Sequence, residues 1–87
     1  MNNEHEKQKA VAIAKHFQGL DKKKVETDAV IYEVTSIAVE LVSRPEPKWT
    51  AVLYAFEVDD TGNKKYEEGA RFFLEKCRLE DFNVLDE

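Results

Sequence analysis

Hydrophobic residues in the first twenty positions recur with the period of an α-helix. Their spacing of i, i+3, i+4 and i+7 forms one apolar stripe. The stripe comprises Ala10, Ile13, Ala14 and Phe17. Asn3 is expected to cap this helix with Glu6 in capping-box spacing, and Gly19 is expected to end it. The chain therefore begins with an amphipathic helix that covers another element.

The segment 30–43 fits two different periods. Its apolar positions form an amphipathic helical pattern, and the arginine before Pro45 would end such a helix. Seven residues between Val30 and Val42 are β-branched, however. In a helix each would cost about 0.5 kcal/mol relative to alanine, or about 3–4 kcal/mol together. Residue preference therefore favours a strand over the helix that periodicity allows.

The next segment, 48–58, alternates like a strand and is apolar on both faces. A strand of this kind needs neighbours in a sheet, and a short proline-containing turn would place 30–43 beside it. The face of Ala51, Leu53 and Ala55 is expected to lack a helix. We expect the C-terminal segment or a second copy of the protein to cover that face.

The rest of the chain gives weaker patterns. Residues 59–64 predict a hairpin turn with Gly62 at positive φ, and 65–79 is interpreted as a returning strand with a bulge at Gly69. A helical stripe over 66–78 fits as well. Residues 80–87 are expected to form a turn or tail that packs back on the domain. The apolar residues of that tail are Phe82, Val84 and Leu85.

The charged segment 21–28 has no periodicity and is interpreted as a linker, in spite of its three adjacent lysines, Lys22, Lys23 and Lys24. The predicted fold is one α+β domain over residues 1–87. An N-terminal helix packs on a three-stranded antiparallel β-meander (α-β-β-β), with a possible short C-terminal helix or tail.

Acidic charge is concentrated late in the chain. The net charge is −5, and residues 57–87 hold 10 acidic and 5 basic residues, whereas 1–56 hold 8 of each. A single cysteine and the lack of a long apolar run favour a cytoplasmic protein without a signal peptide or membrane span. The acidic excess opposes direct binding of nucleic acids.

No catalytic, cofactor-binding or metal-binding arrangement emerges from the residue types and their spacing. His5 has a lysine, not a second histidine, four positions later, so the zinc-protease helix motif is absent. Cys77 lacks a nearby histidine to act as base and is interpreted as a small buried hydrophobic residue. We therefore expect a protein that is not an enzyme.

The function that remains is binding. We expect a small protein-binding or regulatory module, homodimeric, that contacts a basic protein partner through an acidic hairpin. The predicted contact residues are Glu57, Asp59, Asp60, Glu67 and Glu68. An acidic mimic of nucleic acid, or an inhibitor of a nucleic-acid-binding protein, is the alternative, and a small enzyme or ligand carrier is a third possibility.

Overall fold

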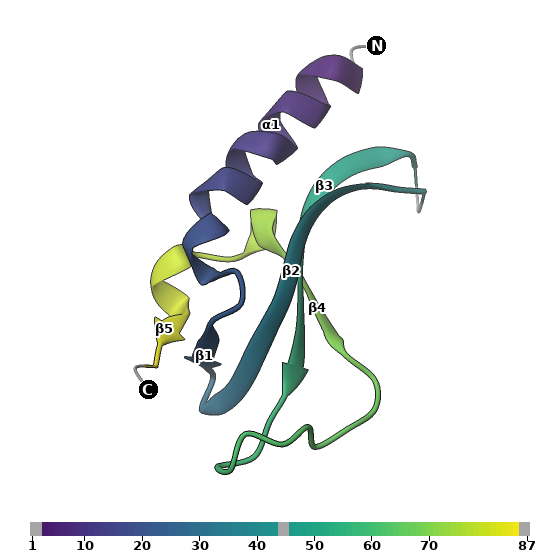
Figure 1. Cartoon of the computed structure of the whole chain (residues 1–87). Helices are drawn as coiled ribbons and strands as arrows, with labels where there is room; N and C mark the ends of the chain where they lie inside the picture. Colours follow the sequence, from purple (N-terminus) through teal and green to yellow (C-terminus); the bar gives the residue numbers. More distant parts are fainter. Residues whose placement is uncertain (1–2, 44–45, 86–87) are drawn as a thin grey trace.

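The computed structural model describes residues 3–43 and 46–85, and it contains one α-helix beside an antiparallel sheet of five strands (Figure 1). The sheet order is β4-β3-β2-β1-β5. The elements are α1 (Asn3–His16), β1 (Lys24–Thr27), β2 (Val30–Val42), β3 (Lys48–Glu57), β4 (Ala70–Phe73) and β5 (Asn83–Val84). Three short 3-10 helices span Gln18–Leu20, Leu74–Lys76 and Leu79–Asp81. The α+β class is thus confirmed, but the sheet is larger than the predicted three-stranded meander.

The N-terminal helix is confirmed, although its predicted end is wrong. α1 stops at His16, and Gly19 lies inside the 3-10 helix that follows. The N–H of Phe17 is shared between two carbonyls of the last turn, which tightens the chain there. Asn3 is the first helical residue, and its side chain lies outside the described part. Glu6 instead accepts a hydrogen bond from the N–H of Trp49, at 3.3 Å.

The ambiguous segment 30–43 is a strand. β2 and β3 pair in antiparallel register from Tyr32 opposite Glu57 to Val42 opposite Lys48, with a bulge at Thr35. Their long hairpin bends strongly at its upper end (Figure 1), where the Trp49 ring lies beneath the Lys7 ammonium group of α1. The predicted proline turn between the two strands falls partly outside the described residues. β-branched preference and a neighbouring strand therefore outweighed helical periodicity.

β1 lies in the segment that was predicted to be a linker, so that prediction is wrong. β1 and β2 are joined by a two-residue turn in which Asp28 and Ala29 both have positive φ, 53° and 66°. Positive φ at both central residues is the type I′ pattern of tight hairpins. The usual sequence signal, Asn-Gly or Asp-Gly, is missing because alanine occupies the second position.

Replacement of Ala29 by glycine is expected to raise the free energy of unfolding by about 1 kcal/mol, because alanine is disfavoured at positive φ. Ala12, exposed in α1, is a matched control. There the same change should lower stability by about 0.8–1 kcal/mol, since glycine weakens a helix. Urea unfolding of the two variants measures both changes, and a loss of stability in Ala29→Gly would contradict the strained turn.

The returning segment is a strand only over Ala70–Phe73, so the predicted strand 65–79 is too long and the alternative helix 66–78 does not form. The predicted turn is confirmed: Gly62 has φ of 89°, and Asp59 and Asn63 bond across it. Gly69 precedes β4 instead of forming a bulge. A Cβ at Gly69 would lie 3.1 Å from the carbonyl oxygen of Ala55. Only glycine fits this close approach without a local shift.

The C-terminal segment packs back on the domain, as predicted. Phe82 is buried, Leu85 donates its N–H to the Lys24 carbonyl, and β5 adds a last strand beside β1. Val84, by contrast, is 42% exposed. The tail therefore forms a 3-10 turn and a short strand, and the sheet gains its fifth strand from it.

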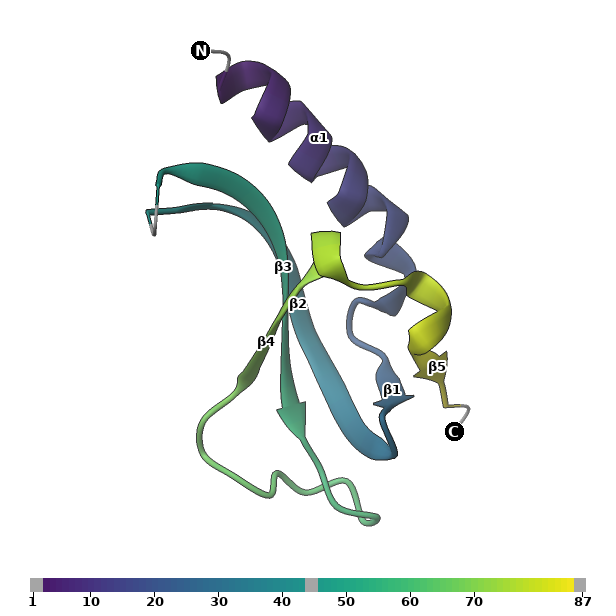
Figure 2. The same cartoon turned by 180° about the vertical axis from the view of Figure 1, so that it is seen from behind.

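The hydrophobic core lies between the sheet and α1, with the C-terminal segment on the same side (Figure 2). Ala51, Leu53 and Ala55 are almost completely buried there. The expectation that their face lacks a helix is therefore wrong. The buried cluster comprises Phe17, Leu20, Val25, Val34, Ala51, Leu53, Ala55, Leu74 and Phe82. It is the opposite face of β2, β3 and β4 that no described element covers.

Candidate binding surface

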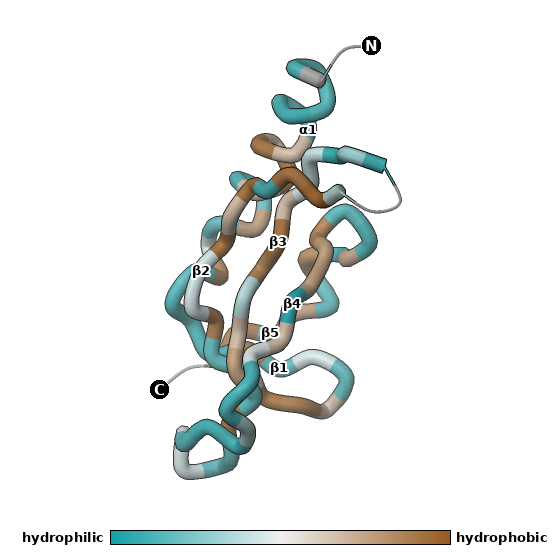
Figure 3. The backbone as a smooth tube through the Cα atoms, turned by 90° about the vertical axis from the view of Figure 1, so that its right-hand side faces the viewer, coloured by the Kyte–Doolittle hydropathy of each residue, from teal (hydrophilic) through white to brown (hydrophobic). Residues whose placement is uncertain are grey.

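The uncovered face of the sheet is formed by the outer residues of β2, β3 and β4, and Figure 3 looks onto it. Strand alternation and the observed register place its residues. They are Ser36, Ala38 and Glu40 of β2, Thr50, Val52 and Tyr54 of β3, and Arg71 and Phe73 of β4. We call this set the open face.

A polar cluster occupies the middle of the open face. The Tyr54 hydroxyl donates a hydrogen bond to the Glu40 carboxylate, and Arg71 lies opposite Tyr54 in the neighbouring strand. The hydrogen bond to Glu40 raises the pKa of Tyr54, with burial adding to the rise and Arg71 partly offsetting it. The Thr35 hydroxyl donates a hydrogen bond to the backbone carbonyl of Tyr54, at 3.1 Å, and so fixes the backbone at that residue. The tyrosine is therefore held in one orientation as a neutral phenol.

Phe73 is the exposed apolar residue of the open face. Its side chain is 37% exposed and lies opposite Val52, which is completely buried. The Arg71 guanidinium lies 5.7 Å from the centre of the Phe73 ring. An aromatic ring with a neighbouring arginine is the combination enriched at the centres of protein interfaces.

Two hollows border the open face. The lower hollow has a volume of about 530 Å³ and is lined by residues that include Ser36, Tyr54, Phe56 and Gly69. A second, of about 440 Å³, lies where Phe73 meets the upper end of the β2–β3 hairpin. The open face is thus an uneven surface and not a flat one.

Two of the five predicted contact residues are engaged within the chain. Glu57, at the end of β3, lies 3.1 Å from the Lys65 ammonium group and raises the pKa of that lysine. The Asp59 carboxylate accepts hydrogen bonds from Thr61 and Asn63 inside the turn. These bonds, the one from the Thr61 hydroxyl first, lower the pKa of Asp59. Both acids thus have a structural role in shaping and bracing the hairpin.

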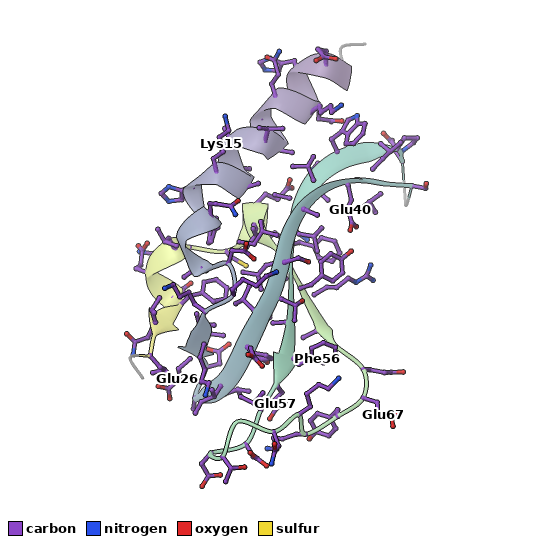
Figure 4. All side chains as sticks on the ribbon, viewed as in Figure 1. Lys15, Glu26, Glu40, Phe56, Glu57 and Glu67 are labelled. Atoms are coloured by element: carbon purple, nitrogen blue, oxygen red, sulfur yellow. The ribbon has the colours of Figure 1, made fainter. Side chains whose placement is uncertain are left out.

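The other three predicted contact residues are exposed. Asp60 lies in the turn, while Glu67 and Glu68 lie in the loop that leads to β4. Glu68 directly precedes Gly69, which lines the lower hollow, and Figure 4 shows Glu67 pointing outward from the same loop. The structure therefore brings two predicted acids, Glu67 and Glu68, to the lower border of the open face.

Sequence reasoning missed the polar cluster because the alternation of 48–58 marks both faces as apolar and singles out neither Tyr54 nor Phe56. Both are half-buried on the same side of β3, and the Lys64 ammonium group lies 4.2 Å from the centre of the Phe56 ring. The available signal was the alternation itself, since Thr50 and Tyr54 lie on the same side of β3. Trp49 belongs to the opposite face of β3.

Catalytic and metal-binding chemistry was also sought in the described residues. Cys77 is half-buried beside the core, and burial, with the Asp81 charge adding, raises its pKa, which makes the thiol a poor nucleophile. In residues 3–43 and 46–85 no three His, Cys, Asp or Glu side chains gather as a metal site. Within the same residues, no helix has the length and apolarity to cross a membrane.

Comparison with protein-family models, with curated proteins and with solved structures gives no match for this chain.

Proposed function

We propose that this protein is a non-enzymatic binding module that contacts a protein partner through the open face. The observation that carries the proposal is an arginine, a tyrosine and an exposed phenylalanine on a sheet face that no described element covers. Arg71, Tyr54 and Phe73 come from adjacent strands whose register is fixed by the ladder. A rigid surface of this kind loses little conformational entropy when a partner binds.

Charge at the border of the open face supports a basic partner. Glu67 and Glu68 are exposed beside the lower hollow, and the chain as a whole has a net charge of −5. Acidic groups at the rim of an interface attract a basic partner and raise its association rate more than its final affinity. We propose Asp60, Glu67 and Glu68 as the steering residues, in a cytoplasmic setting.

An acidic mimic of nucleic acid has weaker support. A mimic presents rows of unpaired acidic groups, whereas the acidic hairpin also carries Lys64 and Lys65. Lys65 pairs with Glu57, and Lys64 covers Phe56. A protein partner therefore fits the surface better than the site of a nucleic-acid-binding protein.

The open face is tested by quantitative capture from a lysate of the source organism. Phe73→Ala is expected to reduce recovery of the partner about tenfold, the effect of losing a central aromatic contact. Val84→Ala is the matched control, because Val84 is a similarly exposed apolar residue. It lies in β5, at the opposite edge of the sheet from β4. Circular dichroism checks that both variants remain folded. Equal recovery with Phe73→Ala would contradict the proposal.

The steering acids need a separate variant, with Asp60→Asn, Glu67→Gln and Glu68→Gln combined. Association with the captured partner is expected to slow several-fold at low salt and to lose most of its salt dependence. Surface plasmon resonance at two ionic strengths measures both effects. An unchanged association rate would remove the acidic loop from the proposed surface while leaving the open face in place.

A further inference from the structure

The upper half of β2 is a free sheet edge. β1 pairs only with the first residues of β2, from Val30 to Glu33. From Ser36 to Val42, β2 has β3 on one side and, among the residues that the structure describes, no strand on the other. No strand lies along that side in Figures 1 and 3. We call Ser36–Val42 the free edge.

The hydrogen-bond pattern shows which backbone groups the free edge exposes. The N–H of Val58 bonds to the carbonyl of Ile31, and the N–H of Val34 bonds outward to Lys23. In an antiparallel strand, the backbone groups of successive residues point alternately toward and away from the neighbouring strand. The two bonds fix which residues of β2 point toward β3, and the bulge at Thr35 shifts this alternation by one residue. It follows that Ile37, Val39 and Leu41 direct their N–H and C=O groups away from β3. Described hydrogen bonds outside the ladder do not involve these groups.

The other edges of the sheet are short or blocked. β4 has four residues and β5 has two. Where β3 extends beyond β4, Glu6 accepts the Trp49 N–H, and Lys48 pairs with Glu75 at 2.7 Å. The free edge has none of the usual protection, because it contains no lysine, proline or bulge and only one charged residue, Glu40. That carboxylate is engaged by Tyr54 on the open face.

We propose that a second copy of the chain pairs with this edge, antiparallel, about a two-fold axis at Val39. In this register Val39 lies opposite Val39 of the second copy, and Ile37 lies opposite Leu41. Outward groups of the three residues on each strand then form about six main-chain hydrogen bonds. Leu41, which is 52% exposed, becomes covered by an isoleucine.

The charge of Glu40 favours this register over the one whose two-fold axis lies one residue later. An axis at Glu40 would place two like charges directly opposite each other, which is destabilising. With the axis at Val39, Glu40 lies opposite Ala38 instead. The segment is thus self-complementary in the way that a two-fold interface requires.

The exposed area of the chain fits one such interface. The chain exposes 6334 Å², whereas a compact monomer of 10.1 kDa exposes about 5,300 Å². The excess of about 1,000 Å² is close to the roughly 800 Å² that each partner buries in a standard interface. The radius of gyration, 13.8 Å, also exceeds the about 12 Å of a compact domain of this length.

Light scattering behind a sizing column tests the dimer with purified protein alone. At about 100 μM, above the micromolar dissociation constants of weak interfaces, the wild type is expected to show twice 10.1 kDa. Leu41→Lys should show a monomer, because a lysine at an edge opposes pairing. Tyr66→Lys is the matched control, since Tyr66 is 59% exposed but lies in a loop, and it should remain dimeric. A monomeric wild type would overturn the proposal.

Amide hydrogen exchange identifies the edge without relying on a variant. In the dimer, the amides of Ile37, Val39 and Leu41 are expected to exchange at least 100-fold more slowly than in dilute monomer. The amides of Ala38 and Glu40, which bond to β3, should be protected in both states. A dimer in which the three outward amides stay unprotected would overturn the assignment to β2.

A disulfide variant gives an independent readout of the register. Val39→Cys in a Cys77→Ala background is expected to form an intermolecular disulfide, because paired strands place opposite Cα atoms about 5.5 Å apart. Ser36→Cys is the control, since two Ser36 residues would lie about 20 Å apart along the strands. Equal cross-linking of both variants would contradict the two-fold at Val39. All of these measurements use the purified protein without a partner, so a missing partner at the open face and a missing dimer are separate outcomes.

Discussion

Replacement of Leu53 by alanine is expected to lower the free energy of unfolding by about 3–5 kcal/mol, the cost of a large cavity in a tight core. Leu53 is completely buried in β3, in the cluster that lies between the sheet and α1. A domain of this length has a total stability of about 4–13 kcal/mol. This one substitution therefore removes a large share of the stability.

Urea unfolding in dilute protein measures the loss, and Leu41→Ala is the matched control. Leu41 is 52% exposed, so the same chemical change there should cost less than about 1 kcal/mol in the monomer. Similar midpoints for the two variants would mean that the core does not lie beneath α1.

Replacement of Phe17 by alanine is expected to cost about 3–5 kcal/mol. The Phe17 ring is 2% exposed and meets Phe82 edge-on at 6.1 Å between ring centres. Phe82 in turn meets Phe72 of β4 at 5.6 Å. Phe17 therefore joins the end of α1 to the C-terminal segment and, through it, to the sheet.

A double-mutant cycle separates this contact from simple cavity formation. Phe17→Ala and Phe82→Ala together are expected to cost about 0.5–1.5 kcal/mol less than the sum of the single changes. Lys15→Ala is the control, because Lys15 is exposed in the last turn of α1 and should change stability by less than about 0.5 kcal/mol. Strict additivity of the two phenylalanine changes would contradict direct packing between them.

The sequence was most informative for elements in which the helix or strand preference of the residues agreed with the packing against neighbouring elements. The β-branched residues of 30–42 and the alternation of 48–57 predicted β2 and β3, and the apolar stripe predicted α1. β1 could not be predicted because its hairpin turn has Ala29 where glycine is usual. Its hydrogen bonds to β5 come from residues near the other end of the chain, and no local pattern reports them.

The candidate surface was predicted only in part. Glu67 and Glu68 were named, and they border the open face. Glu57 and Asp59 were grouped with them because a sequence shows where acidic residues occur. It does not show that Glu57 pairs with Lys65 or that Asp59 bonds to Thr61 inside the chain. The polar cluster around Tyr54 depends on register between three strands, and register is set by packing and turns.

The pairing of β5 with β1 has a consequence for synthesis on the ribosome. Val84 lies opposite Val25, so β1 cannot gain its outer neighbour until nearly the whole described chain has emerged. The β2–β3 hairpin joins residues close in sequence and can form before the C-terminal segment docks. Until then Phe17 lacks Phe82, and the nascent domain is an unfinished sheet with an incompletely covered core.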